Sequence, residues 1–589
     1  MRAGDTVTEG VRPLTEHADG CGGRRLDSRW ALAALGVILV LCTAAWSQRL
    51  DPYLILDDES FYVILGKDLA ETGGYRDLHT PGEPRHQHYP PGYPLIIAAV
   101  FRAWGGASPR QIVIPLKLLN FAFLLGSVGL FYALQRGRER PLVVYGSLFL
   151  FAFHPVTLGV TGAVYSEPAY LFFSLLGILA LERLVMAGTA PRGPAGMLRP
   201  VLAGAATAWP VYLRMNGIAL GVAGVGTLLL RRRWRQALLL GGIWLAMMAP
   251  LFLASRGVPG AGYVSEWFLK DWDRGDASPL TAAALVARLA ENVSTYPLFL
   301  PDVVFMVGRY GRVLLPLAVP LVGGCLLAGL VGRLREENPL QEVYVVIFLL
   351  ILLPWPARNL RYLLPVFPFL HLYIVRGVAT VAQAVARAAR LARPERTGAA
   401  ALAAVLAGAL VSGVHFHLHE AREAAKPVRQ RDEGEWGWLQ GTWEAIHWIG
   451  STAPYGALTM LRKPYLLYVN TGRQGVAYPW AAAEEVIRSA ETQHVQYIVE
   501  DASERTERFL SPALSALAAR GRIALAYETA GHHPTRVWRL EPERVSLPGP
   551  PAGAARREGP AAGAEQREAA APETSVAVKA RREGAWPSF

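Results

Sequence analysis

The chain has 589 residues, a formal net charge of +12 and 52% hydrophobic residues, with a mean hydropathy of +0.23. A chain of this length exceeds one hydrophobic core, so two or more domains are expected. The positive charge does not predict nucleic-acid binding, because the basic residues stand in short clusters between long apolar runs, as in multi-pass membrane proteins. The three cysteines, Cys21, Cys42 and Cys325, lie in or near these runs and exclude a disulfide framework.

Residues 1–29 are polar and glycine-rich and are predicted to form a disordered cytoplasmic tail. The first apolar run, 30–46, lacks a small-x-small cleavage site followed by soluble sequence, so we interpret it as a retained span. A run at 94–104 is too short to span and is expected to lie in the interface or to re-enter. About eleven spans are predicted within a transmembrane domain at 30–414, in chain order 30–46, 112–134, 142–159, 169–186, 201–213, 217–230, 237–254, 313–331, 343–353, 363–375 and 399–414.

The basic clusters predict how these spans are oriented. If residue 1 is inside, the densest arginine clusters fall on the inner side, as the positive-inside rule requires; they lie at 136–140, 192–199, 231–235, 333–335 and 387–396. The same topology places four polar segments together outside: the loop 47–93 and the turns at 165–168, 214–216 and 358–362. A miscount of one span among 165–230 would separate them.

A soluble region is predicted outside the membrane at 415–541. Helical patterns there alternate with strand-like runs at 457–461, 495–500, 523–527 and 535–540, which indicates an α/β domain with about four strands. The last segment, 542–589, is rich in Pro, Ala, Gly, Glu and Arg and is predicted to be disordered.

Three adjacent acids in the first outer loop, Asp57, Asp58 and Glu59, are the leading candidate site. Carboxylates beside a membrane boundary are costly and therefore indicate function. Repulsion among the three is expected to raise the pKa of one, which suits a general base. The alternative is that the acids stabilise the first turn of a helix over 60–70.

Cations in the same outer segments could bind a phosphate. Arg85, His86 and His88 with Tyr89 form one set, and Arg361 with Tyr362 forms another, because arginine binds phosphate through a bidentate fork. The alternatives are a solvated turn near lipid headgroups and an ordinary interfacial anchor.

Two further turns carry candidate residues. Glu167 stands at the start of a span, where the helix dipole also favours a carboxylate. Arg214 and Asn216 lie between two short spans. A stretch with three alternating histidines at 415–419 invites a metal interpretation, but it leaves a helix, in which alternate residues face different sides. Glycine-rich phosphate loops are absent, so nucleotide-driven chemistry is not expected.

Taken together, these motifs resemble the C-type integral-membrane glycosyltransferases. The resemblance is greatest to the branch (family 39-like) with the protein O-mannosyltransferases, lipid A aminoarabinose transferases and lipopolysaccharide-core glycosyltransferases. It covers about residues 30–380 and more loosely the C-terminal region. The matching segments are Asp58-Glu59-Ser60, His88-Tyr89-Pro90-Pro91-Gly92-Tyr93, Tyr165-Ser166-Glu167-Pro168 and Arg361-Tyr362-Leu363-Leu364-Pro365. Relatives usually have an Arg-Pro pair where this chain has Arg214-Met215, which leaves the role of Arg214 open.

The resemblance implies an α-helical polytopic fold with a C-terminal extracytoplasmic α/β domain, in the plasma (inner) membrane. It implies a polyprenyl-phosphate sugar donor and an extracytoplasmic glycan, lipid or protein acceptor, with no nucleic acid. The base would be Asp58 or its neighbour Asp57, acting with inversion. Arg85, His88, Arg361 and Tyr362 would bind the donor phosphate.

The same resemblance implies that Glu167 and Arg214 would orient the acceptor. Some members of the superfamily use a divalent metal ion, which Asp58 and Glu167 could ligate here. The alternatives are a transporter or flippase of a lipid-linked sugar, or a non-enzymatic envelope assembly protein. A transporter favours polar residues at midplane and internal repeats, whereas the polar clusters here stand at span ends.

Overall fold

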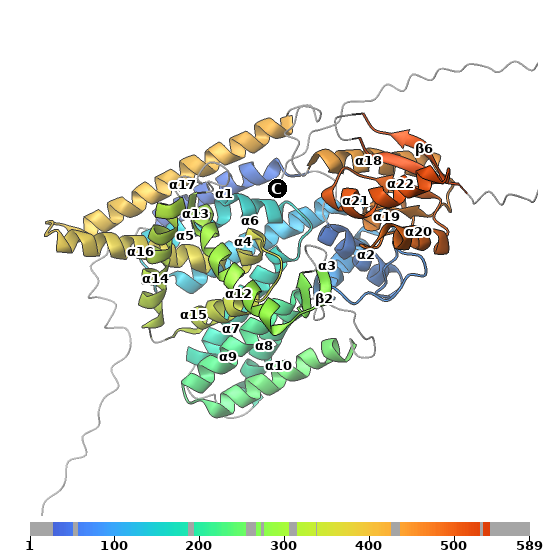
Figure 1. Ribbon diagram of the computed structural model, residues 1–589. Helices are drawn as coiled ribbons and strands as arrows, with labels where there is room; N and C mark the ends of the chain where they lie inside the picture. The colour runs from blue at the N-terminus through green and yellow to red at the C-terminus, as the bar shows by residue number, and fades with distance from the viewer. Residues whose placement is uncertain are drawn as a thin grey trace, which may run out of the picture.

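The computed structural model of the chain describes residues 28–50, 57–186, 194–254, 267–271, 276–305, 315–336, 338–425, 436–530 and 534–541. The expected disordered tails lie outside these residues, except that residues 28 and 29 begin the first helix. The larger, helical part precedes a smaller α/β part (Figure 1). Its helices are α1 Ser28–Ser47, α2 Asp57–Glu71, α3 Gly92–Trp104, α4 Val113–Gln135, α5 Pro141–Phe153, α6 Pro155–Thr161, α7 Glu167–Met186, α8 Pro194–Leu213, α9 Ile218–Leu230, α10 Trp234–Ala254, α12 Ala282–Thr295, α13 Leu300–Phe305, α14 Leu315–Leu334, α15 Leu340–Leu352, α16 Phe367–Ala388 and α17 Pro394–Ala425.

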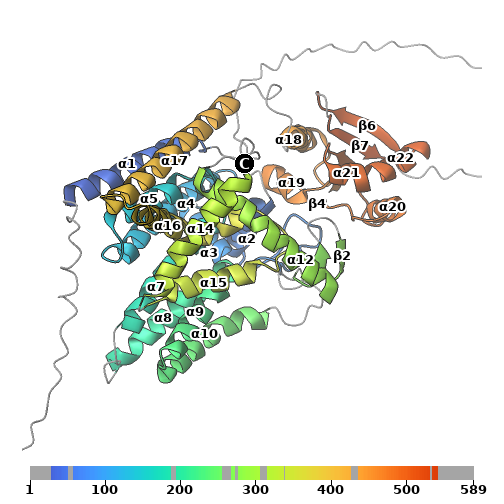
Figure 2. The ribbon, with the colours of Figure 1, turned by 60° about the vertical axis from the view of Figure 1, so that its left-hand side comes forward.

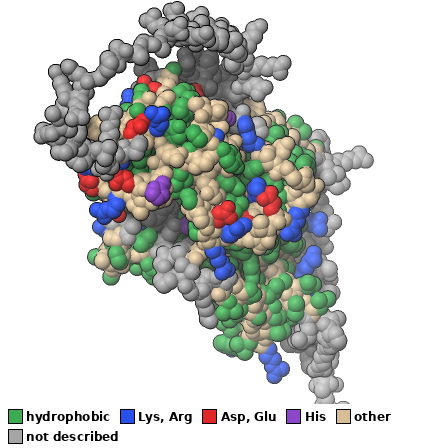
Figure 3. Space-filling view, turned by 90° about the vertical axis from the view of Figure 1, so that its right-hand side faces the viewer, with side chains coloured by type: hydrophobic (Ala, Val, Ile, Leu, Met, Phe, Trp, Pro, Cys, Tyr) green, Lys and Arg blue, Asp and Glu red, His purple; other side chains and the backbone are tan. Residues whose placement is uncertain are grey.

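Three short 3-10 helices, η2 Met215–Gly217, η4 Tyr296–Phe299 and η5 Leu360–Val366, lie between these helices, together with a two-stranded hairpin of β1 Leu269–Asp271 and β2 Asp276–Pro279. α1 and α17 lie side by side, and α8, α9 and α10 form the opposite edge of the helical part (Figures 1 and 2). That edge is mostly hydrophobic on the face drawn in Figure 3. Such a surface is typical of a protein that is surrounded by lipid.

The predicted number of eleven spans is not confirmed by helix length and composition. Five of the described helices are long and apolar enough to cross a membrane, and the bent pair α5–α6 would make a sixth. Each predicted apolar run does coincide with a helix or a bent pair. Several are short, however, because prolines and polar turns interrupt them: α5 and α6 meet at an angle of 54° where His154-Pro155 starts a new helix.

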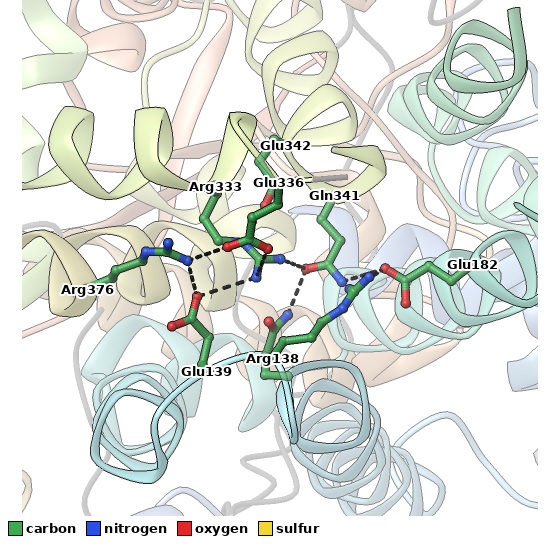
Figure 4. Close-up of polar contacts among 9 residues, drawn as sticks. Arg138, Glu139, Glu182, Arg333, Glu336, Gln341, Glu342 and Arg376 are labelled. Carbon is green, nitrogen blue, oxygen red and sulfur yellow. Dashed lines mark hydrogen bonds and ion pairs between the residues drawn. The ribbon is translucent and has the colours of Figure 1, made fainter. Parts of the chain in front are cut away.

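A network of buried and half-buried charged and polar side chains joins the ends of several helices (Figure 4). It comprises Gln135, Arg138, Glu139, Glu182, Arg333, Glu336, Gln341, Glu342 and Arg376. These residues come from α4, the α4–α5 turn, α7, α14, the α14–α15 turn, α15 and α16. The network therefore connects helices that lie far apart in the sequence.

Arg333 is the centre of the network. Only 1% of its side chain is exposed, and its Nε donates to Glu342 Oε1 at 2.9 Å. Its Nη1 lies 3.0 Å from Glu336 and 3.4 Å from Glu139, both of which also bind Arg376. A guanidinium buried this far from water is stable only because several carboxylates surround it.

Replacing Arg333 by Met is expected to lower the free energy of unfolding by about 3–5 kcal/mol, because it leaves buried carboxylates uncompensated. Denaturant titration in mixed micelles measures the change. Arg335→Met, which replaces an exposed arginine two residues away, is the matched control and should change stability little. Equal losses for both variants would show that the network does not stabilise the fold.

The α/β part contains a five-stranded sheet, where the sequence predicted about four strands. Its strands are β3 Thr459–Met460, β4 Gly475–Val476, β5 Tyr497–Glu500, β6 Ile523–Glu528 and β7 Arg536–Leu540, and its helices are α18 Trp436–Thr452, α19 Pro464–Thr471, α20 Ala483–Thr492, α21 Glu504–Phe509 and α22 Ser511–Ala519. The strand order is β4-β3-β5-β7-β6, with β4, β3 and β5 parallel and the β5–β7 and β7–β6 pairs antiparallel. Strand β4 was not predicted, because two residues are too few to show a strand-like pattern in the sequence. α17 continues to Ala425, beyond residue 415 where the soluble region was expected to begin.

The α/β part packs against α2 and the loop that follows it. The rings of Tyr465 in α19 and Phe61 in α2 lie 4.7 Å apart. The backbone N–H of Gly475 donates to the carbonyl of His79 at 2.9 Å. These contacts hold the outer loop between the two parts of the molecule.

Candidate active site

The three adjacent acids form the first turn of α2, and the side chains of Asp58 and Glu59 have different partners. The carboxylate of Glu59 is buried and accepts a 2.7 Å hydrogen bond from the backbone N–H of Val164. Asp58 takes two other partners, described below. Asp57 is the first residue of α2, and its side chain lies outside the described part of the molecule. Glu59 therefore anchors α2 to the segment before α7, which leaves Asp58 to face the candidate site.

Asp58 lies between a tyrosine and an arginine from distant segments. The hydroxyl of Tyr89 donates to Asp58 Oδ1 at 2.7 Å, and Arg361 Nη2 donates to Oδ2 at 2.8 Å. The Asp58 side chain is 22% exposed, so water can reach it. Arg361 follows Asn359, whose side chain accepts a 2.8 Å hydrogen bond from the Arg361 backbone N–H at the start of η5.

Glu167, at the start of α7, brings two guanidinium groups together. Its Oε1 lies 3.1 Å from Arg214 Nη1 and 3.3 Å from Arg361 Nε, and its side chain is 1% exposed. Arg214 also donates to the Ser166 hydroxyl at 3.1 Å, and the Arg361 guanidinium lies 4.3 Å above the Tyr165 ring. The turn at 165–168 therefore positions both arginines.

The site thus contains Asp58, Glu167, Arg214 and Arg361, which the sequence placed in three turns and one loop. Helices α2 and α7 begin here, and η5 leads directly into α16. The partial positive charge at helix N-termini adds to that of the two arginines and favours an anion.

The pKa of Asp58 does not shift in the direction expected for repelling acids. Burial raises the pKa of this carboxyl, but the charge of Arg361, the Tyr89 hydrogen bond and the charge of Arg214 together hold it below its ordinary value. Repulsion was expected to raise the pKa of one of the acids. For Asp58 that expectation is wrong, because Glu59 binds Val164 and two guanidiniums lie near Asp58 instead.

The loop 72–91 holds Tyr89 in place through a chain of side chains. His86 bonds to Asp77 through Nδ1 at 2.7 Å and accepts from the Tyr89 backbone N–H at 2.9 Å through Nε2. The Tyr75 hydroxyl donates to the Tyr89 carbonyl at 2.8 Å. His86, predicted to contact phosphate, therefore orients the residue that contacts Asp58.

Gly92 explains why the loop ends in Pro-Pro-Gly. A Cβ at this position would stand 2.5 Å from the Tyr212 carbonyl oxygen at the end of α8. Only glycine allows this approach, which brings the start of α3 close to the segment with Arg214.

Three other predicted phosphate contacts lie at the edge of the site. Arg85 is exposed in the loop, opposite Arg76. His88 is half-buried, and its ring contacts that of Tyr89 edge-on at 4.4 Å. Tyr362 lies beside Arg361, with its ring 5.4 Å from that guanidinium. Of the predicted cations, Arg361 contacts Asp58 and Glu167, and Arg214 contacts Glu167.

Sequence reasoning missed the two hydroxyl groups beside Arg214. The Tyr62 hydroxyl lies 3.1 Å from that of Ser166, which in turn accepts from Arg214. Ser166 stands within one of the segments that carried the resemblance, and Tyr62 follows another by two residues. A hydroxyl, however, has no sequence pattern that distinguishes a site residue from a packed one.

The described residues do not fit a divalent ion between Asp58 and Glu167. Both carboxylates bind the Arg361 guanidinium, which would repel a cation. Nowhere in the described ranges do three or more His, Cys, Asp or Glu side chains form a group suited to a metal. His417, in the histidine stretch at 415–419, instead bonds to the carbonyl of Phe153 at 3.2 Å.

Replacing Tyr89 by Phe is expected to raise the pKa of Asp58, because the hydroxyl that stabilises the carboxylate is removed. For any activity that needs the ionised Asp58 carboxylate, the acidic limb of the pH profile should then move to a higher pH. A pH profile of kcat/KM measures the shift. Tyr455→Phe is the control, since this tyrosine is 82% exposed and belongs to the α/β part. An unmoved acidic limb in Tyr89→Phe would contradict the expectation.

No protein-family model matches the sequence, and no curated protein matches it at the sequence level. Solved structures are nevertheless similar in fold. ArnT from Cupriavidus metallidurans bound to undecaprenyl phosphate has a TM-score of 0.51 and 14% identity, covering 89% of this chain and 100% of that one. The Archaeoglobus fulgidus oligosaccharyltransferase with zinc and sulfate has a TM-score of 0.53 and 14% identity, covering 85% and 72%.

A second structure of the archaeal enzyme, AglB with an inhibitory peptide and a dolichol-phosphate, has a TM-score of 0.52 and 12% identity, covering 88% of this chain and 75% of that one. The matches with both proteins cover 85–89% of this chain, so they include the helical part and extend into the α/β part. The protein is thus a multi-pass membrane protein that has the C-type fold of the integral-membrane glycosyltransferases.

Proposed function

We propose that this protein is a membrane glycosyltransferase that moves a sugar from a polyprenyl-phosphate donor to an extracytoplasmic acceptor, with inversion. The observation that supports this most is the Asp58 carboxylate, held beside Arg361 and near Arg214 in a partly water-accessible position. A base for the acceptor and cations for the leaving phosphate are what such a reaction needs.

In the proposed step, an acceptor hydroxyl or amine gives its proton to Asp58 while its oxygen or nitrogen bonds to the anomeric carbon. The bond from that carbon to the phosphate oxygen breaks, and its electron pair leaves with the polyprenyl phosphate. The lowered pKa keeps Asp58 ionised at neutral pH. Each carboxylate oxygen has two lone pairs, so it can accept this proton while bonded to Tyr89 or Arg361.

Arg361 stabilises the charge that develops on the phosphate, and we assign Arg85, His88 and Tyr362 as further donor-phosphate contacts. Glu167 contacts both Arg361 and Arg214, and Glu167 and Arg214 orient the acceptor. Asp57, adjacent to Asp58 at the start of α2, is the second candidate base. The neighbours' bound undecaprenyl phosphate and dolichol-phosphate support a lipid-phosphate donor.

The site is proposed to open to the outer side of the plasma membrane, together with the α/β part. Helix α7 begins at the site with Glu167, α9 follows Arg214 after the short helix η2, and α16 follows Arg361 after η5. α9 is followed by Arg231, Arg232 and Arg233, and α16 ends beside Arg387 and Arg390. The positive-inside rule puts those ends in the cytoplasm and the site outside.

Mass spectrometry of envelope glycans and lipid-linked sugars tests the proposal in cells that lack the protein. We expect one sugar to be missing from an envelope glycan, lipid or protein, and the polyprenyl phosphate that carries a sugar of the same mass to accumulate. Expression of the wild-type chain should reverse both changes. Unchanged glycans and unchanged donor levels would overturn the proposal.

A further inference from the structure

Helix α12 buries two polar side chains and exposes two valines. Arg288 is 4% exposed and Asn292 is fully buried, whereas Val286 and Val293 are 66% and 57% exposed. A buried arginine and a buried amide are costly unless their donors find acceptors. The contacts of these two side chains therefore indicate what the helix does.

Asn292 binds the segment 353–359, which joins α15 to η5. Its Nδ2 donates to the carbonyls of Leu353 at 2.5 Å and Trp355 at 2.9 Å. Arg288 Nη1 donates to the carbonyl between them, that of Pro354, at 3.0 Å. Three consecutive carbonyls of an irregular segment thus receive their hydrogen bonds from side chains of one distant helix, where a regular element would use its own backbone.

Further contacts fix the same two elements to each other. Asn292 Oδ1 accepts from Arg358 Nε at 2.5 Å, and Arg358 Nη2 lies 2.6 Å from Glu291. The second nitrogen of Arg288, Nη2, donates to the carbonyls of Leu269 and Lys270 in strand β1 at 2.5 and 2.7 Å. The segment is therefore held to α12 at both its start and its end.

The segment that α12 holds, residues 353–358, leads directly to the candidate site. Arg358 is followed by Asn359, which caps the backbone N–H of Arg361. The Arg361 side chain then reaches Asp58 at 2.8 Å and Glu167 at 3.3 Å. Only residues 359 and 360 lie between this segment and Arg361, and residue 360 already begins η5. A displacement of residues 353–358 would therefore move Arg361 as well.

We propose that Asn292 and Arg288 are positioning residues, which position Arg361 by donating hydrogen bonds to the carbonyls of residues 353–355. This inference rests on the proposed function, in which Arg361 stabilises the leaving phosphate. Asn292 suits this task because a single amide supplies two donors for carbonyls and one acceptor for Arg358.

Asn292→Asp tests the proposal with little change of shape. The carboxylate keeps an acceptor for Arg358, but it presents oxygen in place of the two donated hydrogens. A misplacement of about 1 Å can cost about 10²-fold in rate, so we expect kcat/KM for transfer to fall by about 10²-fold. Val293→Ala, an exposed neighbour on the same helix, should stay near the wild-type value.

A double-mutant cycle with Arg361→Lys separates positioning from a general loss of structure. If Asn292 acts through Arg361, Asn292→Asp should cost little more in a chain that already carries Arg361→Lys. Losses that multiply in the double variant would overturn the proposal. Asn292→Ala provides a second, uncharged variant, for which the same non-additive result is expected.

Hydrogen exchange of peptides that cover residues 353–361 tests whether α12 holds this segment, without any transfer assay. Exchange should be faster in Asn292→Asp and Asn292→Ala than in the wild-type chain and Val293→Ala. Unchanged exchange in the Asn292 variants would refute the proposed role of Asn292 even if transfer is observed. Faster exchange in the Asn292 variants, together with a wild-type chain that transfers no sugar, would instead refute the proposed function but support the role of Asn292 in holding residues 353–361.

Discussion

Asp58→Asn is expected to lower the rate of sugar transfer by about 10²–10⁴-fold, the usual contribution of a general base. Asn keeps the size of the side chain and can still contact Tyr89 and Arg361, but its amide cannot accept the acceptor's proton. Envelope glycan analysis in cells that express only the variant measures the loss. Binding of undecaprenyl phosphate to the purified variant should persist, because the cations remain.

Glu71→Gln is the matched control for this variant. Glu71 is the last residue of α2, the helix that begins with the acids, and its exposed carboxylate pairs with Lys67. It should support wild-type glycans. If Asp58→Asn restores the glycans as well as Glu71→Gln does, Asp58 is not the base, and an Asp57→Asn variant then shows whether its neighbour is.

Arg361→Lys is expected to lower transfer by about 10²–10³-fold, as for removal of one preorganised donor to a developing negative charge. Lysine keeps the charge, but it lacks the planar fork that contacts Asp58 through Nη2 and Glu167 through Nε. The rate of transfer and the affinity for undecaprenyl phosphate should fall together, because the same group binds the phosphate in the proposed step.

The control for Arg361→Lys is Arg387→Lys. Arg387 is exposed in the last turn of α16, the helix that follows η5, and it lies at the end remote from the site. Loss of transfer only in Arg361→Lys supports the assigned role. A loss of the same size in both variants would contradict it.

The gathering of distant polar turns is the feature that the sequence predicted best. Asp58 and Arg361 are 303 residues apart, yet counting apolar runs placed both on one side of the membrane, and the structure joins them. Glu167 and Arg214 came from two further turns by the same argument. This worked because a membrane leaves only two sides, so the number of crossings decides which turns can meet.

The pKa direction and the span count could not be predicted in the same way. The pKa of Asp58 depends on where Glu59 and Arg361 point, and adjacency in the chain says nothing about that. The expected eleven spans assumed continuous helices, whereas His154-Pro155 breaks one of them. Asn292 escaped notice because a side chain that bonds to backbone carbonyls has no sequence pattern.

The most direct test uses the purified chain in liposomes with a polyprenyl-phosphate sugar and an envelope acceptor from cells that lack the protein. The account predicts that polyprenyl phosphate is released and the sugar becomes bound to the acceptor, in equal amounts and only when acceptor is present. It would be contradicted if the chain carried the donor across the liposome membrane and left its sugar–phosphate bond intact.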